Sequence, residues 1–442
     1  MARDPSSRTR PAPAATTGTK ASTRRRFLRQ AALLSGGAFA GRAGGAHAAD
    51  AASGEAAPNL QAYVPEWSRT LGAPVLASPY GVPSKFEANV RRRESPGLTR
   101  TRHSSVTFTP LASLFGIITP SGLHFERHHA GVPEIDPHQH RLMIHGMCRH
   151  PRVFSMDDLM RFPSVSRVHF IECGANTGME WNNVAVPTVQ YTHGMIGCSE
   201  WTGVALSTLL DEVGFDRNAQ YVLAEGADGA ALTRTLSMAM ALDDVLVVYG
   251  QNGEMLRPEQ GYPLRLVVPG VQGVSSVKWL RRLKIGDVPW NTREESLHYV
   301  DMLPGGKHRQ YTWIQEAKSV ITSPSGGQVI RDRGFHEITG LAWSGRGKVR
   351  RVDVSTDGGR NWRTATLQEP VHTKALTRFR IDWHWDGSRA LLQSRVVDDT
   401  GFVQPTYRQL REVRGTRSIY HNNAIQTWRV DASGEVSNVQ LA

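Results

Sequence analysis

Cysteine is scarce in this chain of 442 residues, which contains only Cys148, Cys173 and Cys198. Three cysteines are too few for a disulfide framework, and they leave one thiol that must be buried, reactive or bound to a metal. The sequence also lacks the C-x-x-C-H motif of covalently attached haem and any C-x-x-C repeat typical of an iron–sulfur cluster. We therefore expect no haem and no iron–sulfur cluster in this chain.

Long hydrophobic runs are missing as well. No uninterrupted apolar stretch approaches the roughly 20 residues that a membrane-spanning helix requires. Apolar residues make up 40% of the chain and charged residues 21%, which is an ordinary globular balance. At this length we expect about two or three domains and no membrane segment.

Positive charge is in excess, and its distribution decides what it means. The formal net charge is +12, but the first 48 residues hold nine Lys and Arg against one acidic residue, Asp4. The rest of the chain therefore has a net charge of only +4. Because nucleic-acid-binding domains are usually strongly basic, this balance argues against a nucleic-acid partner.

The basic N-terminus has its features in the order of an export signal. The sequence TRRRFLR (residues 23–29) precedes the apolar stretch AALLSGGAFAG and the small-x-small sequence Ala46-His47-Ala48. Residues 1–48 resemble a twin-arginine signal peptide, which is an address and not an anchor. A basic disordered tail is the alternative. Twin-arginine export carries folded proteins, often with a cofactor inserted, so the resemblance implies a periplasmic protein with a complex cofactor.

The next two segments differ in composition. Residues 49–100 are rich in Pro, Ala and Ser, which predicts an extended arm. Within residues 101–315, helical spacing over residues 206–213 ends at Gly214, and residues 246–249 predict a strand. Helices and strands alternate irregularly here, which favours an α+β fold over a doubly wound sheet.

A third pattern begins near Lys318. Alternating segments at residues 352–354 and 392–396 lead into the turn sequences DGG and DDTG. Short strands separated by such turns predict a β-sandwich of the immunoglobulin type over residues 316–430, with a β-barrel as the alternative. Residues 431–442 are expected to form a C-terminal tail.

Cys173 lies in the stretch HFIECGANTGMEW (residues 169–181), at the expected end of a strand. The small residues that follow allow a bulky ligand to approach the backbone closely. A buried core thiol is an equally good interpretation, because free cysteine is among the most buried residue types. A nucleophilic cysteine requires a base, and His169 lies four residues back along the strand. The pattern alone leaves these interpretations open.

Two further stretches carry polar groups suited to an anionic ligand. In FERHH (residues 125–129), Arg127 can make bidentate hydrogen bonds to an anion and His129 can donate from its ring. In the strand and glycine loop of residues 260–280, Arg265 and Lys278 flank backbone N–H groups, which suits a phosphorylated cofactor. Surface histidines and surface cations are the plain alternatives. The loop is neither a dinucleotide fingerprint nor a Walker loop.

Together these stretches resemble a known family. The order F-x-R-x-H, an isolated Cys before a small-residue loop, then G-Y-P-x-R-x-V-V-P-G and V-K-W-L is similar to the molybdopterin domain of the sulfite oxidase family. The sequence TDGG-x-x-W (residues 356–362) resembles the immunoglobulin-like dimerisation domain of that family. Within the family, ECGANTGMEW, GCSEWTG, EAKSVIT and NAIQTW resemble the molybdenum subunits of sulfane dehydrogenases from bacterial sulfur-oxidising (Sox) systems.

The resemblance implies a role for individual residues. It makes Cys173 the protein thiolate on molybdenum and places Arg127 and Tyr299 with it in the catalytic site. The residues that it assigns to molybdopterin binding are Phe125, Arg127, His128, His129, Asp228, Gln260, Arg265, Ser276, Val277 and Lys278. Cys148 and Cys198 are expected to be buried structural thiols.

Two positions depart from the sulfite oxidase pattern. Gln260 stands where those enzymes have a histidine; it can form hydrogen bonds but cannot carry charge. Gly178 stands where they place an arginine in the sulfite pocket. The loss of that cation weakens the binding of a small dianion, and we expect the glycine to leave room for a bulkier substrate.

The resemblance thus implies a molybdenum–molybdopterin oxidoreductase that oxidises sulfane sulfur on a carrier-protein cysteine by oxo transfer. Electrons would pass to a c-type cytochrome subunit, because this chain has no haem motif, and the C-terminal domain would form a homodimer. A sulfite dehydrogenase acting on free sulfite and a molybdenum reductase of the same family are the alternatives. A periplasmic binding protein is a third, but it gives no reason for the cationic loops.

Overall fold

The computed structural model describes residues 71, 81–95, 101–310, 313–417 and 419–441. The fold below is that of the described residues from Val82 onward. The predicted signal peptide and most of the predicted arm lie outside the described residues. The end of the arm contains the short strand β1 (Arg93–Glu94), which pairs with β2 (Thr107–Phe108).

Two five-stranded sheets form the first domain. One has the order β10-β9-β6-β5, with β11 also paired to β9, and is antiparallel throughout. Its strands are β5 (Val165–Glu172), β6 (Ile196–Ala205), β9 (Leu246–Gln251), β10 (Glu254–Met255) and β11 (Arg265–Val267). The other has the order β4-β3-β12-β7-β8, in which only β3 and β12 are parallel. Its strands are β3 (Leu142–Gly146), β4 (Arg152–Phe154), β7 (Tyr221–Gly226), β8 (Thr233–Ser237) and β12 (Leu280–Gly286).

Short helices accompany these sheets: α2 (Met156–Met160), α3 (Val189–His193), α4 (Leu206–Val213), α5 (Met238–Asp243) and α6 (Arg293–Ser296). Helix α4 has the predicted bounds and buries Leu206, Leu209, Leu210 and Val213 at helical spacing. It ends because Gly214 adopts a left-handed conformation with φ of 62°. The predicted strand at residues 246–249 is also confirmed, as part of β9.

The second domain is a sandwich of two sheets, as predicted. One sheet has the order β15-β16-β20-β19 and the other β18-β17-β21-β22-β23. The strands are β15 (Lys318–Ser323), β16 (Gly334–Trp343), β17 (Val349–Ser355), β18 (Arg363–Thr364), β19 (Thr366–Leu367), β20 (Thr377–Trp385), β21 (Ala390–Asp398), β22 (Thr427–Val430) and β23 (Val436–Val439). Trp343, Phe379 and Trp428 are fully buried in its core. The α+β fold with a following sandwich is therefore confirmed.

The prediction of a C-terminal tail at residues 431–442 is wrong for residues 436–439. Strand β23 lies inside it and pairs antiparallel with β22 from Thr427↔Val439 to Val430↔Val436. Val436 is 2% exposed and belongs to the sandwich core. The segment is short and largely polar, as tails are, but β23 within it forms the edge strand of the sheet.

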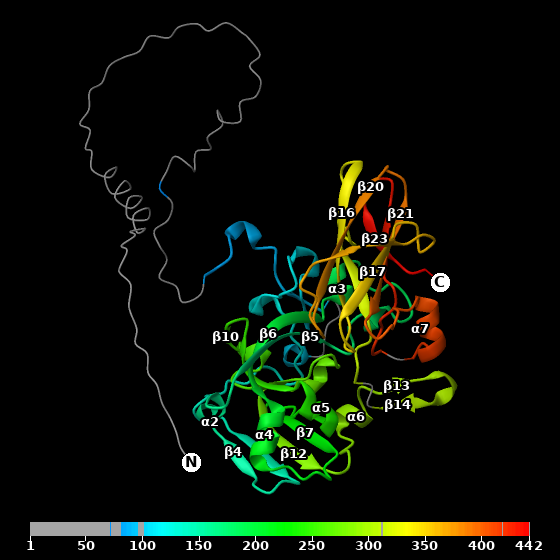
Figure 1. Cartoon of the computed structure of the whole chain (residues 1–442). Coiled ribbons are helices and arrows are strands. Elements are labelled where there is room, and N and C mark those ends of the chain that lie inside the picture. Colours follow the sequence, from blue (N-terminus) through cyan, green and yellow to red (C-terminus); the bar gives the residue numbers. More distant parts are fainter. Residues whose placement is uncertain (1–70, 72–80, 96–100, 311–312, 418, 442) are drawn as a thin grey trace, which may run out of the picture. The chain divides into compact units, whose positions relative to one another are not determined.

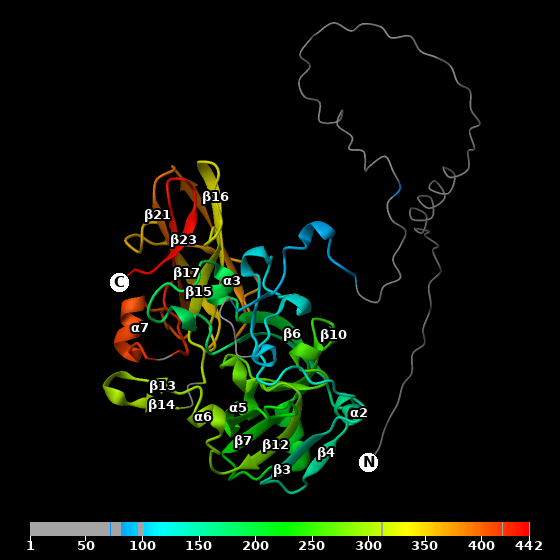
Figure 2. The same cartoon turned by 180° about the vertical axis from the view of Figure 1, so that it is seen from behind.

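Figures 1 and 2 show the sandwich strands β16, β17 and β21 grouped apart from β7 and β12 of the first domain. Helix α7 (Tyr407–Arg414) and the hairpin of β13 (Asp301–Met302) and β14 (His308–Arg309) lie side by side in both views. An ion pair of 2.7 Å between Arg414 and Asp301 joins them. None of the helices among the described residues is long and apolar enough to cross a membrane.

Candidate active site

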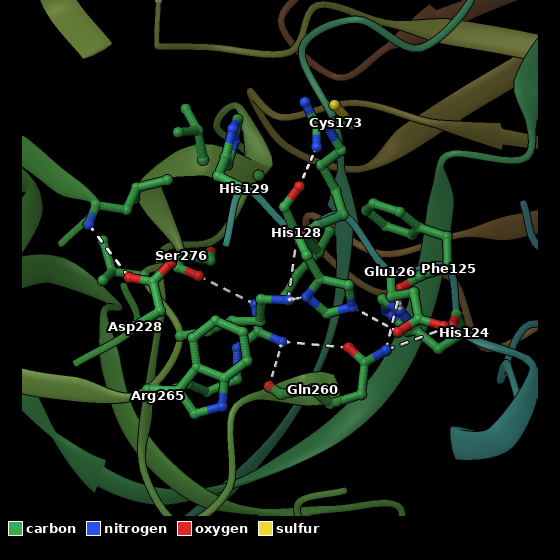
Figure 3. Close-up of a pocket in the computed structure, with 18 of the residues that line it drawn as sticks. His124, Phe125, Glu126, His128, His129, Cys173, Asp228, Gln260, Arg265 and Ser276 are labelled. Carbon is green, nitrogen blue, oxygen red and sulfur yellow. Dashed lines mark hydrogen bonds and ion pairs between the residues drawn. The ribbon is translucent and has the colours of Figure 1, made fainter. Parts of the chain in front are cut away.

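A cavity in the first domain collects the residues that the sequence motifs singled out (Figure 3). The predicted residues that line it are Phe125, Arg127, His128, His129, Cys173, Asp228, Gln260, Arg265, Ser276, Val277, Lys278 and Tyr299. These come from segments up to 174 residues apart in the sequence, from Phe125 to Tyr299. The lining residues to which no individual role was assigned are His124, Glu126, Ile171, Leu232, Gly273, Val274 and Trp279, of which Glu126, Ile171, Gly273, Val274 and Trp279 lie within the predicted stretches.

Strand β5 delivers Cys173 to one end of the cavity. The strand ends at Glu172, and the Cys173 N–H donates to the carbonyl of Met195 at 2.9 Å, while its own carbonyl accepts from the Asn176 N–H at 2.9 Å. The side chain is 7% exposed. Burial raises the pKa of the Cys173 thiol, and the charges of Arg127 and Lys318 oppose that rise.

His169 is not placed to act as a base for Cys173. Its Nδ1 lies 3.3 Å from the carbonyl oxygen of Lys374, and it is not among the residues that line the cavity. Cys198 is fully buried within β6, where burial raises its pKa to about 12, and burial also raises the pKa of the partly exposed Cys148. Both are free thiols outside the cavity, so the prediction that both are buried is confirmed for Cys198 and wrong for Cys148. The geometry therefore favours a ligand role for Cys173 over a nucleophilic one.

The FERHH stretch is extended and lies beside residues 104–106, with Val106 bridged to Arg127. Nη1 of Arg127 donates to the carbonyl oxygens of Ser104 at 3.2 Å and Ser105 at 3.5 Å. Burial, followed by the charge of Arg127, lowers the pKa of His129 to about 4, so His129 is neutral at neutral pH. It can then donate one hydrogen bond and accept another.

Lys278 occupies the other end of the cavity. Its Nζ donates to the carbonyls of Arg127 at 3.1 Å and Glu259 at 3.0 Å, and to Nδ1 of His128 at 2.9 Å. The other ring nitrogen of His128 lies 2.5 Å from the carboxylate of Glu126. Burial, followed by the charge of Arg265, holds the pKa of Lys278 well below its usual value. The ammonium is therefore held at a site where burial disfavours its charge.

Arg265 on β11 lies next to Lys278 and is 3% exposed. Its guanidinium donates to the carbonyl of Gln260 at 2.9 Å and to that of Ser276 at 3.1 Å. Burial lowers its pKa to about 9. Gln260 in turn donates to the carbonyl of Phe125 at 3.0 Å, so the residue that replaces a histidine joins two walls of the cavity (Figure 3).

The donor set fits a cofactor that is anionic at this end. The ion pairs within the described ranges include none to Arg265 or Lys278, although buried cations are normally paired with an anion. Over the same residues, Nε2 of His124 is buried at the cavity without a hydrogen-bond partner, and burial lowers the pKa of His124 to about 3. A phosphate would satisfy the cations, and the Cys173 thiolate at the opposite end suits a soft metal.

The described residues contain no cluster of three or more His, Cys, Asp or Glu side chains that could hold a metal ion. A metal in this cavity would therefore take its remaining ligands from the cofactor itself. The single thiol and the cationic end fit molybdopterin, which brings two sulfurs and a phosphate.

Tyr299 approaches the Cys173 end from the segment before β13. It is 8% exposed, has φ of 55°, and its ring stacks on that of Tyr420 with centroids 4.8 Å apart. Burial raises the pKa of the Tyr299 phenol, and the negative charge of Cys173 raises it further. Tyr420, which belongs to the segment after α7, had no motif that could have identified it.

The expectation that Gly178 leaves extra room for substrate is wrong. Gly178 starts a short 3-10 helix (Gly178–Glu180) and does not line the cavity. A Cβ at this position would collide with the backbone oxygen of Ile419, because the C-terminal segment packs against this loop. The N–H of His421 also donates to the carbonyl of Gly174 at 2.7 Å. The second domain thus fills the space beside Gly178.

Comparison with known proteins adds independent information. The family model of the oxidoreductase molybdopterin binding domain matches residues 129–293. The family model of the Mo-co oxidoreductase dimerisation domain matches residues 309–428. The chain is 33% identical over 331 residues to mitochondrial sulfite oxidase of Mus musculus and 32% identical over 332 residues to that of Homo sapiens. These matches cover 69% and 68% of this chain, and the chain spans only 60% of the length of each relative.

A nitrate reductase of Phaseolus vulgaris is 30% identical over 322 residues, which are 64% of this chain and 35% of that protein. Among solved structures, the sulfane dehydrogenase SoxCD from Paracoccus pantotrophus contains a chain that is 49% identical, with a TM-score of 0.85. The match covers 88% of this chain and 100% of that one. Both family models match this chain in order, and the chain is at least 32% identical to mitochondrial sulfite oxidases over more than two thirds of its length. This protein therefore belongs to the sulfite oxidase family of molybdopterin oxidoreductases.

Proposed function

We propose that the protein is a periplasmic, molybdenum-dependent sulfane dehydrogenase. Its substrate is a persulfide or thiosulfonate on the cysteine of a carrier protein, and its electrons pass to a c-type cytochrome. The observation that carries this proposal is the 49% identity to a chain of the Paracoccus sulfane dehydrogenase along the whole of that chain. The export signal that residues 1–48 resemble supports the periplasmic location.

The residues of the cavity divide between holding the cofactor and serving the substrate. Arg265, Lys278 and Ser276 would hold the phosphate of molybdopterin, and His128 would support Lys278. The other cofactor contacts in this proposal are Phe125, His129, Asp228, Gln260 and Val277. When bound, the molybdenum cofactor supplies oxygen-atom transfer to sulfur together with a two-electron change of oxidation state.

Cys173 has to lose its proton to act as a metal ligand. Burial raises the thiol pKa, while the positive charges of Arg127 and Lys318 favour the thiolate. Because the pKa of the free thiol is raised, the bound metal itself would have to displace the proton, and the two cations lower the cost of that step. The same surroundings exclude water, which strengthens each of these interactions.

Arg127 and Tyr299 would serve the substrate. Because burial raises the pKa of Tyr299, its hydroxyl keeps its proton at neutral pH and can donate a hydrogen bond to an oxygen of the substrate or product. Arg127 supplies a permanent positive charge on the same side of the cavity. Together they can orient a sulfur compound that gains oxygen.

The second domain supports a homodimer in this proposal, because the matching family model is that of a dimerisation domain. The electron acceptor has to be a separate protein, since the sequence has no motif for covalent haem. A c-type cytochrome takes one electron at a time and is a suitable periplasmic acceptor.

Oxidation of free sulfite is the second candidate function. The observation that favours it is the identity of 32% to 33% to vertebrate sulfite oxidases. The two functions differ in the size of the substrate and in whether a carrier protein is needed.

The test combines metal analysis with a cytochrome assay. We expect about one molybdenum per chain in the purified protein, its loss in Cys173→Ser, and its retention in the control Cys198→Ser, because Cys198 is buried away from the cavity. We expect cytochrome c reduction with carrier-bound persulfide and little with free sulfite. Efficient oxidation of free sulfite at micromolar KM, without activity on the carrier, would assign the protein to sulfite instead.

A further inference from the structure

Glu172, the residue before Cys173, is a buried carboxylate that does not line the cavity. It is 2% exposed. Its Oε1 accepts from Nδ2 of Asn176 at 2.9 Å and from Nζ of Lys318 at 3.0 Å, and its Oε2 accepts from Nε1 of Trp343 at 2.8 Å. Three donors on two oxygens leave this carboxylate little freedom to rotate.

Two of these donors belong to the second domain. Lys318 is the first residue of β15 and Trp343 the last of β16, and the two are direct partners across the strand pair. Nζ of Lys318 also lies 5.8 Å from the centre of the Trp343 ring. The Lys318 side chain is 3% exposed, so one end of the sandwich holds a charged group out of water in order to reach Glu172.

The second domain also contacts the residues after Cys173. The Lys318 ammonium donates to the carbonyl of Asn176 at 3.4 Å, and the N–H of His421 donates to the carbonyl of Gly174 at 2.7 Å. The backbone after Cys173 is therefore held in part by residues at least 142 positions away in the sequence.

Stability alone gives no reason for a charged pair at this place. Taking two ions out of water costs so much that an apolar pair of similar volume is often as stable or more stable. Orientation does give a reason, because a residue next to a metal ligand that is fixed by directed hydrogen bonds fixes the ligand as well. We propose that Lys318 and Trp343 are positioning residues, which set the place of the Cys173 sulfur by holding Glu172.

This proposal makes the sandwich part of the active site and does not depend on the substrate. It rests on the molybdenum site alone, so it is tested without any sulfur compound. If the protein oxidises sulfite and not sulfane, the proposal is unaffected.

The first test removes one hydrogen bond and keeps the aromatic ring. In Trp343→Phe, Glu172 loses its Oε2 donor. The matched control is Trp428→Phe, because Trp428 is also fully buried in the sandwich and its Nε1 donates to the carbonyl of Ile321 at 3.0 Å. Both holoenzymes are examined by thermal unfolding, by the electron paramagnetic resonance spectrum of the dithionite-reduced molybdenum, and by the rate at which molybdenum is lost on dialysis.

We expect both variants to unfold at similarly lowered temperatures, and only Trp343→Phe to show an altered spectrum. Its molybdenum should be lost about tenfold faster than that of the wild type, which is the lower end of the effect of removing a partner of a metal ligand. A wild-type spectrum and a wild-type rate of loss in Trp343→Phe would overturn the proposal. Equal changes in Trp428→Phe would do the same.

The second test covers the case in which Trp343→Phe does not fold. Lys318→Met leaves Glu172 buried without its cation, and adding Glu172→Gln removes the uncompensated charge. We expect the double variant to recover the unfolding temperature that Lys318→Met loses but to keep an altered spectrum. A double variant with the wild-type spectrum would show that the pair serves only domain packing.

Discussion

The two ends of the cavity differ in how their buried charged side chains are paired. At the cationic end, Arg265 and Lys278 donate to carbonyl oxygens and to a histidine nitrogen, and burial lowers the pKa of both. At the thiol end, the carboxylate of Glu172 is held at 3.0 Å by the ammonium of Lys318. Among the described residues, the carboxylates near Lys278 act on it only from beyond ion-pair distance, whereas Lys318 and Glu172 form a direct pair.

The difference separates residues that bind from residues that position. A buried cation without an anion is unfavourable in the protein alone and becomes favourable when an anionic ligand arrives. A buried pair that is already satisfied gains nothing from a ligand, and it can hold neighbouring groups in place. Buried cations without a direct ion pair thus mark the cofactor site. Buried charges that are already paired mark the residues that hold the site in place.

The same substitution at the two lysines gives the sharpest test of this contrast. Lys318→Met should lower the free energy of unfolding by about 3–5 kcal/mol, because it leaves the Glu172 carboxylate buried and unpaired. Lys278→Met should lower the free energy of unfolding of the cofactor-free protein by much less, because removing a cation that burial disfavours offsets the loss of its three hydrogen bonds. Urea unfolding of the two variants and the wild type measures both effects.

For cofactor retention we expect the larger loss in Lys278→Met and the smaller loss in Lys318→Met. Lys278→Met should weaken retention of the cofactor roughly tenfold to a hundredfold, as expected for one charge-assisted hydrogen bond. The amount of pterin released from each purified variant after denaturation measures this loss. If Lys278→Met destabilised the cofactor-free protein as much as Lys318→Met does, the two ends would not differ in the pairing of their buried charges.

Glu180 extends the contrast to a carboxylate that Lys318 influences without forming an ion pair with it. Like Glu172 it is 2% exposed, but it accepts from the amide of Asn438 and from backbone N–H groups. Burial raises the pKa of Glu180 to about 7 from its ordinary value of 4.5. The folded state therefore binds more protons than the unfolded state between these values, and stability falls as the pH rises from about 4.5 to 7.

Glu180→Gln removes this dependence. The variant should gain about 3 kcal/mol over the wild type at pH 8 and very little at pH 4.5, as follows from a pKa difference of this size. Urea unfolding of both proteins across this pH range measures the difference. A constant difference between the two proteins at all pH values would mean that Glu180 does not titrate in this range.

The sequence predicted the cationic end better than the thiol end. The residues of the cationic end occur in two contiguous motifs, FERHH and QGYPLRLVVPG with SSVKWL, so that local patterns were enough to identify them. All the residues proposed as cofactor contacts line one cavity. Their roles as ligands of the cofactor stay predictions.

The framework of the thiol end could not be predicted in this way. Lys318 and Trp343 look like ordinary residues of two strands, and only the packing of the domains brings them to Glu172, 146 and 171 positions away. Tyr420 likewise reaches Tyr299 only through the folded chain. Alternation shows which residues share a face of a strand, but it does not show which distant segment covers that face.

The smallest effect that we expect concerns the contact between the thiol end and the C-terminal segment. Gly178→Ala places a methyl group against the backbone oxygen of Ile419 and should lower the free energy of unfolding by about 1–3 kcal/mol, as overpacking does. Gly81→Ala is the control, since a Cβ there meets no atom within 4 Å. Chemical denaturation of both variants measures the difference. Equal stability of the two would show that the C-terminal segment yields freely, in which case the thiol end is less rigidly closed than its hydrogen bonds indicate.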